Sequence, residues 1–310
     1  MDSTPIAVID LGTNTFNLLV ASAGPQEQLK VLHSEDRGVA LGRGGVEQGS
    51  LTEEAIDRAM TALRGFQEQA HARGAVRIWG IGTSAMRNCR NSDVLVARAA
   101  RELGISIRII DGDEEALTIL NGVRQVLSIG DRPELLMDIG GGSVEFVLAT
   151  GHAVMWKHSF ELGTTRLLER FGPADPMTID QELRLAAHID DHLAPLYMVL
   201  ERHAPHRLIG SAGSFDSLAE LVQRSRNGPD LGEGDQLTFE AGEFLEVKDR
   251  VLQLDRPQRS VLPGLPAYRV DTFPIALLLI DRVLNAGQIR QLAWSRYALK
   301  EGAAYELLFA

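Results

Sequence analysis

Residues 135–149, LLMDIGGGSVEFVLA, form the stretch of sequence that decides the fold. An apolar run ends in Asp138, the glycines Gly140, Gly141 and Gly142 follow, and a second β-prone run leaves the turn. This order predicts two antiparallel strands joined by a glycine turn. Consecutive glycines weaken a strand, but a backbone without Cβ atoms lets neighbouring N–H groups point together at an anion. A plain tight hairpin is the alternative, although it needs only one or two such residues.

Two carboxylates flank this turn, because Asp138 enters it and Glu145 leaves it. A carboxylate beside an anion-binding turn is repulsive unless a cation such as Mg²⁺ lies between them. The stretch therefore predicts a phosphate-binding turn with a Mg²⁺ ion next to it.

The N-terminus repeats the pattern. Residues 6–21, IAVIDLGTNTFNLLVA, align without a gap on residues 134–149, so that Asp10 falls on Asp138 and the apolar positions coincide. Two copies in one register indicate two similar halves, each presenting an Asp and a polar turn to one cleft.

Composition narrows the class of protein. The chain has 310 residues, which suggests about two domains, and 45% of them are hydrophobic, enough for two cores. A net charge of −11 argues against general nucleic-acid binding and against an anionic membrane surface. The single cysteine, Cys89, rules out an internal disulfide and fits the cytoplasm. The apolar run 273–280 is too short to span a bilayer and is expected to be a buried helix.

The first half carries three further candidate residues. After three strands in residues 6–37, a glycine-rich loop carries Arg37 and Arg43, which are either solvated charges or a basic lip over an anionic substrate. A strand over 75–81 is followed by Arg87, and polar residues just past a strand end are where α/β sheets hold ligands. Arg87 is therefore expected to contact phosphate. Cys89 has no paired histidine nearby in sequence, so a nucleophilic role is disfavoured.

Residues 111–123, DGDEEALTILNGV, place several carboxylates at the start of an apolar helix. Capping of the helix dipole explains why an acidic residue stands at Asp111. It does not require Glu115, which comes one residue before the apolar face of the helix begins. This helix is expected to cross from one half to the other.

The second half contains a third candidate ligand loop. A short strand over 207–210 leads into SAGS and a helix, which brings Ser211 and Gly213 to a helix N-terminus. His188 and His192 stand at the i, i+4 spacing of zinc ligands on a long helix over 178–200, but a solvated helix face is favoured. The other expected elements are helices beginning at 52, over 93–103, over 269–286 and in the tail, and strands over 105–110, 152–160 and 289–293, with a polar loop over 224–236.

Together these motifs resemble the exopolyphosphatase and guanosine pentaphosphate phosphohydrolase (Ppx/GppA) family in its short two-domain form. The resemblance spans nearly the whole chain, through DLGTNTFNLL, TSAMRNCRN, GDEEA, DIGGGSVE, ELGTTRLLERF, SAGS, PGLPAYR and SRYALKEG. It implies an α/β fold class of two ribonuclease-H-like (actin-like ATPase) domains around a central cleft. The expected division is residues 1–122 with 296–310, and residues 123–295.

The resemblance also implies roles. Glu115 would activate a water molecule, Arg87 would contact the phosphate, and Asp138 and Glu145 would be associated with Mg²⁺. Asp10 matches the first phosphate turn, and its carboxylate offers a further hard oxygen ligand for the ion. With the loop arginines and the third turn added, the expected phosphate-binding residues are Gly12, Thr13, Asn14, Gly140, Gly141, Gly142, Ser143, Arg37, Arg43, Arg166, Ser211 and Gly213. The sequence departs from the family pattern at Ala40 and Val144, and these departures concern substrate binding more than the chemical step.

The expected reaction releases orthophosphate from polyphosphate or from pppGpp, and the sequence does not separate the two substrates. It also leaves a homodimer open. Two other classes are a kinase of the same superfamily, which would release no phosphate without an acceptor, and a non-catalytic nucleotide sensor, which would turn over very slowly. The acidic cluster with Glu115 argues against both.

Overall fold

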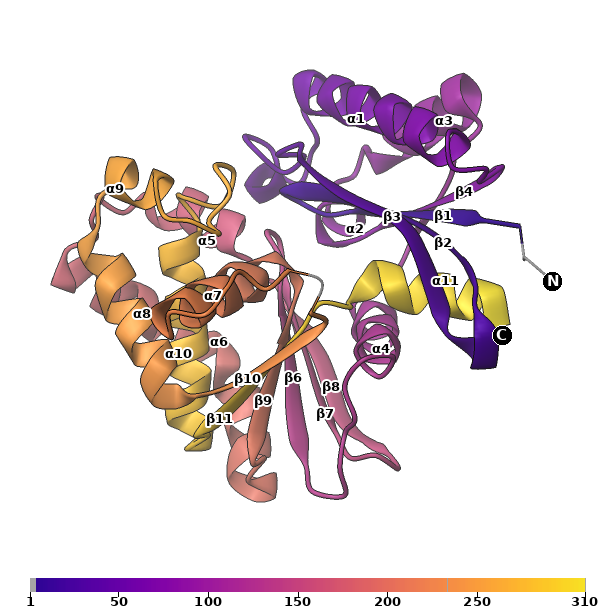
Figure 1. Cartoon of the computed structure of the whole chain (residues 1–310). Helices are drawn as coiled ribbons and strands as arrows, with labels where there is room; N and C mark the ends of the chain where they lie inside the picture. The colour runs from indigo at the N-terminus through magenta and orange to yellow at the C-terminus, as the bar shows by residue number, and fades with distance from the viewer. Residues whose placement is uncertain (1–3, 233, 310) are drawn as a thin grey trace. The chain divides into compact units, whose positions relative to one another are not determined.

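The structure is a computed structural model that describes residues 4–232 and 234–309. The chain divides into two compact units, which we call unit 1 (Met1–Gln125 with Tyr297–Ala310) and unit 2 (Val126–Arg296). Figure 1 shows both units as sheets covered by helices. Among the described residues, no helix is both long and apolar enough to cross a membrane.

Unit 1 is built on a mixed sheet of order β3-β2-β1-β4-β5. Its strands are β1 (Ile6–Leu11), β2 (Thr15–Ala23), β3 (Leu29–Gly38), β4 (Arg77–Gly82) and β5 (Ser106–Ile109). The helices α1 (Glu53–His71) and α3 (Ser92–Leu103) pack their apolar residues into one core with alternate residues of β1 and β2. The Thr52 side chain accepts a hydrogen bond from the Ala55 N–H and so caps α1 where the sequence predicts.

Two further helices of unit 1, α4 (Gly112–Val123) and α11 (Leu299–Phe309), come from distant parts of the chain and pack against each other (Figure 1). They approach so closely that a Cβ at Gly122 would lie 2.0 Å from the Ala298 carbonyl oxygen. A Cβ at Gly302 would lie 1.9 Å from the Thr118 carbonyl oxygen. Glycine on both helices therefore permits this crossing.

Unit 2 has a mixed sheet of order β10-β11-β9-β6-β7-β8. Its strands are β6 (Glu134–Ile139), β7 (Val144–Ala149), β8 (Val154–Phe160), β9 (Arg207–Ser211), β10 (Gln236–Glu240) and β11 (Gln291–Ser295). One core joins this sheet to the long helices α6 (Ile179–His203), α7 (Ala212–Ser225), α8 (Ala241–Gln253) and α10 (Phe273–Gly287). The remaining helices are α2 (Ser84–Asn88), α5 (Thr164–Phe171) and α9 (Arg256–Ser260), with short 3₁₀ turns η1 (Pro25–Glu27) and η2 (Val46–Gln48).

The internal repeat seen in the sequence is also present in the pairing register of the strands. In unit 1, Asp10 on β1 lies opposite Asn17 on β2, and in unit 2, Asp138 on β6 lies opposite Glu145 on β7. In both units the first strand also pairs in parallel with the fourth strand of that unit, β4 or β9. The α/β fold class with two related domains is therefore confirmed, and β10 is an antiparallel strand added at the edge of unit 2.

Some elements differ from the sequence-based expectation. Arg37 lies within β3 rather than in the loop, because β3 continues its pairing with β2 as far as Gly38. The helix expected from residue 269 begins at Phe273, after a turn in which the Arg269 carbonyl accepts from Thr272 and Phe273. The apolar run 273–280 is a buried helix, as predicted.

Candidate active site

The first turn, residues 12–15, lies between β1 and β2, and its carbonyl oxygens are held by the loop that follows β3. The Gly42 N–H donates to the Thr13 carbonyl at 2.8 Å, and the Ala40 N–H donates to the Asn14 carbonyl at 2.7 Å. Because the C=O and N–H of one trans peptide point in opposite directions, these bonds aim the following N–H groups away from the loop. The Thr13 hydroxyl is buried and has no hydrogen-bond partner among the described residues.

The second turn is held in the same way by the start of α5. The Gly140 carbonyl accepts from Thr164 at 3.0 Å, the Gly141 carbonyl accepts from Thr165 at 2.9 Å, and the Gly142 carbonyl accepts from Gly163 at 3.1 Å. Three successive carbonyls point at α5, so the three peptide N–H groups that follow them, ending at that of Ser143, point the other way. Converging N–H groups of this kind bind anions, which supports a phosphate-binding turn over a plain hairpin.

Arg166 braces this second turn. Its Nε donates to the Gly142 carbonyl at 3.1 Å, and its Nη2 pairs with Glu161 at 2.7 Å. Gly163 is required beside it, because a Cβ there would lie 2.3 Å from backbone atoms of Gly141 and Gly142. The structure thus gives Arg166 a role in shaping the turn, and a direct phosphate contact by Arg166 stays a prediction.

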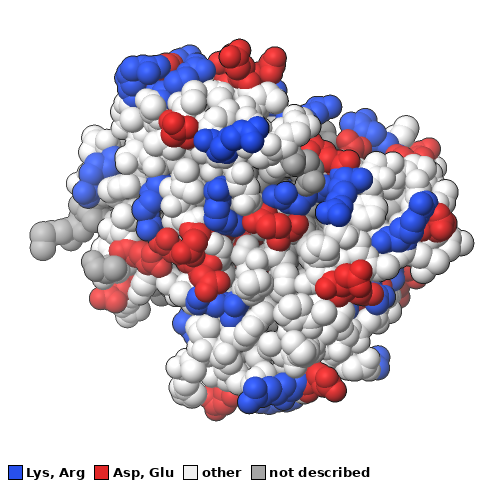
Figure 2. Space-filling model, turned by 180° about the vertical axis from the view of Figure 1, so that it is seen from behind, with Lys and Arg blue, Asp and Glu red and all other residues white. Residues whose placement is uncertain are grey.

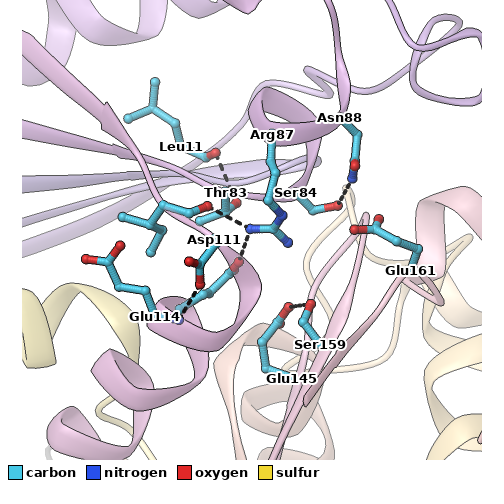
Figure 3. A network of polar contacts seen from close by, with 12 residues as sticks. Leu11, Thr83, Ser84, Arg87, Asn88, Asp111, Glu114, Glu145, Ser159 and Glu161 are labelled. Atoms are coloured by element: carbon cyan, nitrogen blue, oxygen red, sulfur yellow. Dashed lines mark hydrogen bonds and ion pairs between the residues drawn. The ribbon is translucent and has the colours of Figure 1, made fainter. Parts of the chain in front are cut away.

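Glu115 and Arg87 meet inside unit 1. Asp111 caps α4 by accepting from the Glu114 N–H, which starts the helix so that Glu115 falls in its first turn. Arg87 comes from α2, just past the end of β4 (Figure 3). Its Nη1 donates to Glu115 Oε2 at 2.9 Å and to the Ile110 carbonyl at 3.0 Å. Glu115 is only 6% exposed. A buried carboxylate paired with an arginine is a frequent feature of functional sites.

The carboxylates of unit 2 lie in a polar row that crosses four strands, formed by Ser211, Asp138, Glu145 and Ser159. The Ser211 hydroxyl donates to Asp138 Oδ2 at 2.6 Å, and the Ser159 hydroxyl donates to Glu145 Oε1 at 2.7 Å, the latter shown in Figure 3. In unit 1 the corresponding carboxylate, Asp10, accepts instead from the Asn17 amide at 2.9 Å.

This row fits a magnesium ion. Asp138 is 7% exposed and Glu145 is 2% exposed, and opposed residues of an antiparallel pair point to the same face. Two buried anions side by side favour a cation between or beside them. Among the described residues no group of three or more His, Cys, Asp or Glu gathers as a metal cluster. Mg²⁺ often takes only one or two carboxylates, its other ligands being substrate phosphates and water.

The other candidate residues of unit 1 are the two arginines near the glycine-rich loop and the single cysteine. Arg43 is exposed in its loop, whereas Arg37 pairs with Glu35 at 2.7 Å and lies over the Phe66 ring. Cys89 is buried in the core of unit 1, and its expected lack of a catalytic role stays a prediction.

The third turn is occupied by an arginine that the sequence reasoning did not single out. A Cβ at Gly213 would lie 2.1 Å from Nη2 of Arg269, so the guanidinium rests on this glycine. Ala212, beside it, has a φ of +64°, a left-handed conformation that alanine rarely adopts. The only sign of Arg269 in the sequence was the motif PGLPAYR, which contains it.

Comparison with known proteins identifies the family. The Ppx/GppA phosphatase family matches residues 19–309, and the chain belongs to it. Exopolyphosphatase 2 of Mycobacterium tuberculosis is 31% identical over 320 residues, which cover 99% of each chain. A crystal structure of an exopolyphosphatase from Cytophaga hutchinsonii is 36% identical, with a TM-score of 0.94 over 98% of this chain and 97% of that one. A Ppx/GppA family member from Aquifex aeolicus shares the fold at 21% identity, with a TM-score of 0.81 over 98% and 97%.

Proposed function

We propose that this member of the Ppx/GppA phosphatase family hydrolyses the terminal phosphoanhydride of inorganic polyphosphate, of pppGpp or of both, and releases orthophosphate. The observation that carries the proposal is the buried Glu115 carboxylate held by Arg87 at 2.9 Å, one helical turn from the start of α4. The relatives at 31% and 36% identity are named as exopolyphosphatases, which supports polyphosphate as the substrate class.

In this proposal Glu115 orients and deprotonates the attacking water. Without substrate, the Arg87 guanidinium pairs with Glu115. When substrate binds, a phosphate oxygen would compete with Glu115 for the same guanidinium. Substrate binding would therefore draw Arg87 toward the phosphate and leave the Glu115 oxygen to accept a proton from water. A general base of this kind contributes about 10²–10⁴-fold to the rate.

The two turns would supply the electrostatic part of the catalysis. Peptide N–H groups aimed by the bonds at Thr13, Asn14 and the three glycines would donate to phosphate oxygens, which carry more charge as the anhydride bond breaks. Asp138 and Glu145 would hold Mg²⁺, which neutralises phosphate charge when bound. Asp10 is proposed as a further carboxylate associated with the ion.

The decisive assay measures orthophosphate release from long polyphosphate, short polyphosphate, pppGpp and ATP side by side, with Mg²⁺ and with excess EDTA. We expect release from polyphosphate or pppGpp that requires the cation and no added acceptor. Phosphorylation of a small acceptor, with no orthophosphate released in its absence, would indicate a kinase. Full activity in EDTA would remove the proposed role of the carboxylates.

A further inference from the structure

The polar row of unit 2 has a feature that the matching row of unit 1 lacks. Each of its two carboxylates accepts a hydrogen bond from a serine on a neighbouring strand. The strand order is β9-β6-β7-β8, so each serine lies on the side of its carboxylate that faces away from the other carboxylate. Ser211 on β9 pairs in register with Asp138, and Ser159 on β8 pairs in register with Glu145. The two hydroxyls therefore engage the carboxylates from the outer sides of the row.

The corresponding row of unit 1 shows that these serines are not demanded by the fold. There the positions are held by Ile81, Asp10, Asn17 and Asp36, in the same order across β4, β1, β2 and β3. The single carboxylate in the middle, Asp10, accepts from the Asn17 amide opposite it at 2.9 Å, and no serine stands at the flanking positions. Serines accompany the row only in the unit where two carboxylates meet.

Hydrogen bonds from these hydroxyls have a geometric consequence. A carboxylate that accepts a short O–H bond on one oxygen loses rotational freedom, and its other oxygen is fixed in direction. Ser211 is fully buried, so its hydroxyl does not exchange this bond readily for one to water, and Ser159 is half-buried. Partners of this kind around metal ligands typically contribute 10–100-fold to metal affinity.

We propose that Ser159 and Ser211 are positioning residues that hold the Glu145 and Asp138 carboxylates in the orientation that binds a divalent cation. The inference rests on the proposed function for the use of that cation. It assigns Ser211 to the support of Asp138, where the sequence alone suggested a phosphate contact.

The test uses Ser159, because its side chain is the more exposed of the two. Ser159→Ala removes the hydroxyl, and Ser159→Thr keeps it on a residue that suits a strand. The control is Ser225→Ala, which removes a serine hydroxyl of the same unit, on an exposed residue, that donates to the Leu221 carbonyl away from the row. Mn²⁺ is the probe, titrated into each full-length variant with and without orthophosphate, and free Mn²⁺ is read by electron paramagnetic resonance.

We expect Ser159→Ala to raise the Mn²⁺ dissociation constant about 10-fold, and Ser159→Thr and Ser225→Ala to stay within about 2-fold of the wild type. The Mg²⁺ concentration for half-maximal phosphate release should rise in parallel, while kcat at saturating Mg²⁺ recovers.

Three results would overturn the inference: wild-type Mn²⁺ affinity in Ser159→Ala, equal weakening in Ser225→Ala or in Ser159→Thr, or no Mn²⁺ binding by the wild type. If no substrate yields phosphate but Ser159→Ala still weakens Mn²⁺ binding, the proposed function fails and the positioning role stands.

Discussion

Arg87 and Glu115 form the residue pair on which the account depends, and they are 28 positions apart in the sequence. Each residue was predictable from the sequence, because Arg87 follows a strand end and helix capping does not require Glu115. Their contact was not predictable, because it depends on how α2 and α4 pack.

The arginines of unit 1 should differ in their effect on substrates of different length. We expect Arg87→Ala to lower kcat/KM by a similar factor on long and short polyphosphate, because the reacting phosphate is present in both. The exposed Arg43 would contact phosphates of polyphosphate that lie further from the reacting end. Arg43→Ala should therefore lower kcat/KM more on long than on short polyphosphate, and the loss should be modest in high salt. Steady-state kinetics on the two chain lengths measure this. Equal losses for both variants on both substrates would refute separate roles.

A surface pair in unit 2 makes stability depend on pH. Hydrogen bonds from Arg226, at 2.6 and 2.8 Å, lower the pKa of Glu243 below its ordinary value of 4.5. A carboxyl whose pKa is lower in the folded state adds stability above its unfolded pKa and loses it as the pH falls through the folded value.

The wild type should therefore be more stable than Arg226→Met at pH 7, by less than about 1 kcal/mol because the pair is partly exposed. The difference should vanish well below pH 4.5. Urea unfolding of both proteins across this range checks it, and a gap that persists at the lowest pH would show that lost packing, not charge, is responsible.

At the scale of helices and strands, the two hairpins were predictable from the sequence. The hydrogen bonds that orient their turns were not. The hairpin pattern is local, since alternation, glycine and aspartate all fall within sixteen residues. The bonds that aim the second turn come from Thr164 and its neighbours, 24 positions beyond Gly140. Strand β10 and helix α8 were not predicted, although α8 carries the buried apolar residues Phe244, Val247 and Val251 at helical spacing. Ser159 carried no mark in the sequence, because an isolated serine in a strand has many uses.

The crossing of α4 and α11 is a second non-local feature, and it gives a stability prediction. In Gly122→Ala the new methyl group would meet the Ala298 backbone, 2.0 Å from its carbonyl oxygen, so the helices must separate. We expect a loss of about 1–3 kcal/mol in the free energy of unfolding, measured by urea denaturation. The control is Gly104→Ala, which has open space around it but a left-handed φ of +65°, so it reports backbone strain alone. A wild-type stability for Gly122→Ala would show that the helices are not packed this closely.

For the whole molecule, charge is the property that bears most on the substrate. The net charge is −11, and Figure 2 shows a face on which Lys and Arg are interspersed with Asp and Glu instead of forming one basic field. A long polyanion is repelled by such a surface except where local arginines hold it. The substrate would then be retained by few contacts, and fewer contacts mean faster dissociation of partly shortened chains.

We therefore expect short-reach processivity on long polyphosphate. A gel time course should show a ladder of intermediates, and short chains should be preferred. Disappearance of the full-length substrate without intermediates, in a protein shown to be monomeric, would contradict this; in a dimer it would point to a shared basic groove.

The most direct test of the central claim is turnover and binding in Glu115→Gln. Glutamine keeps the shape of the side chain and cannot take a proton from water, so we predict a fall in kcat of at least about 100-fold with polyphosphate affinity kept within a few-fold. The control is Glu114→Gln, whose carboxylate is exposed and pairs with Arg108 at 2.5 Å, and it should remain active. Turnover near that of the wild type in Glu115→Gln would exclude Glu115 as the base and contradict the account.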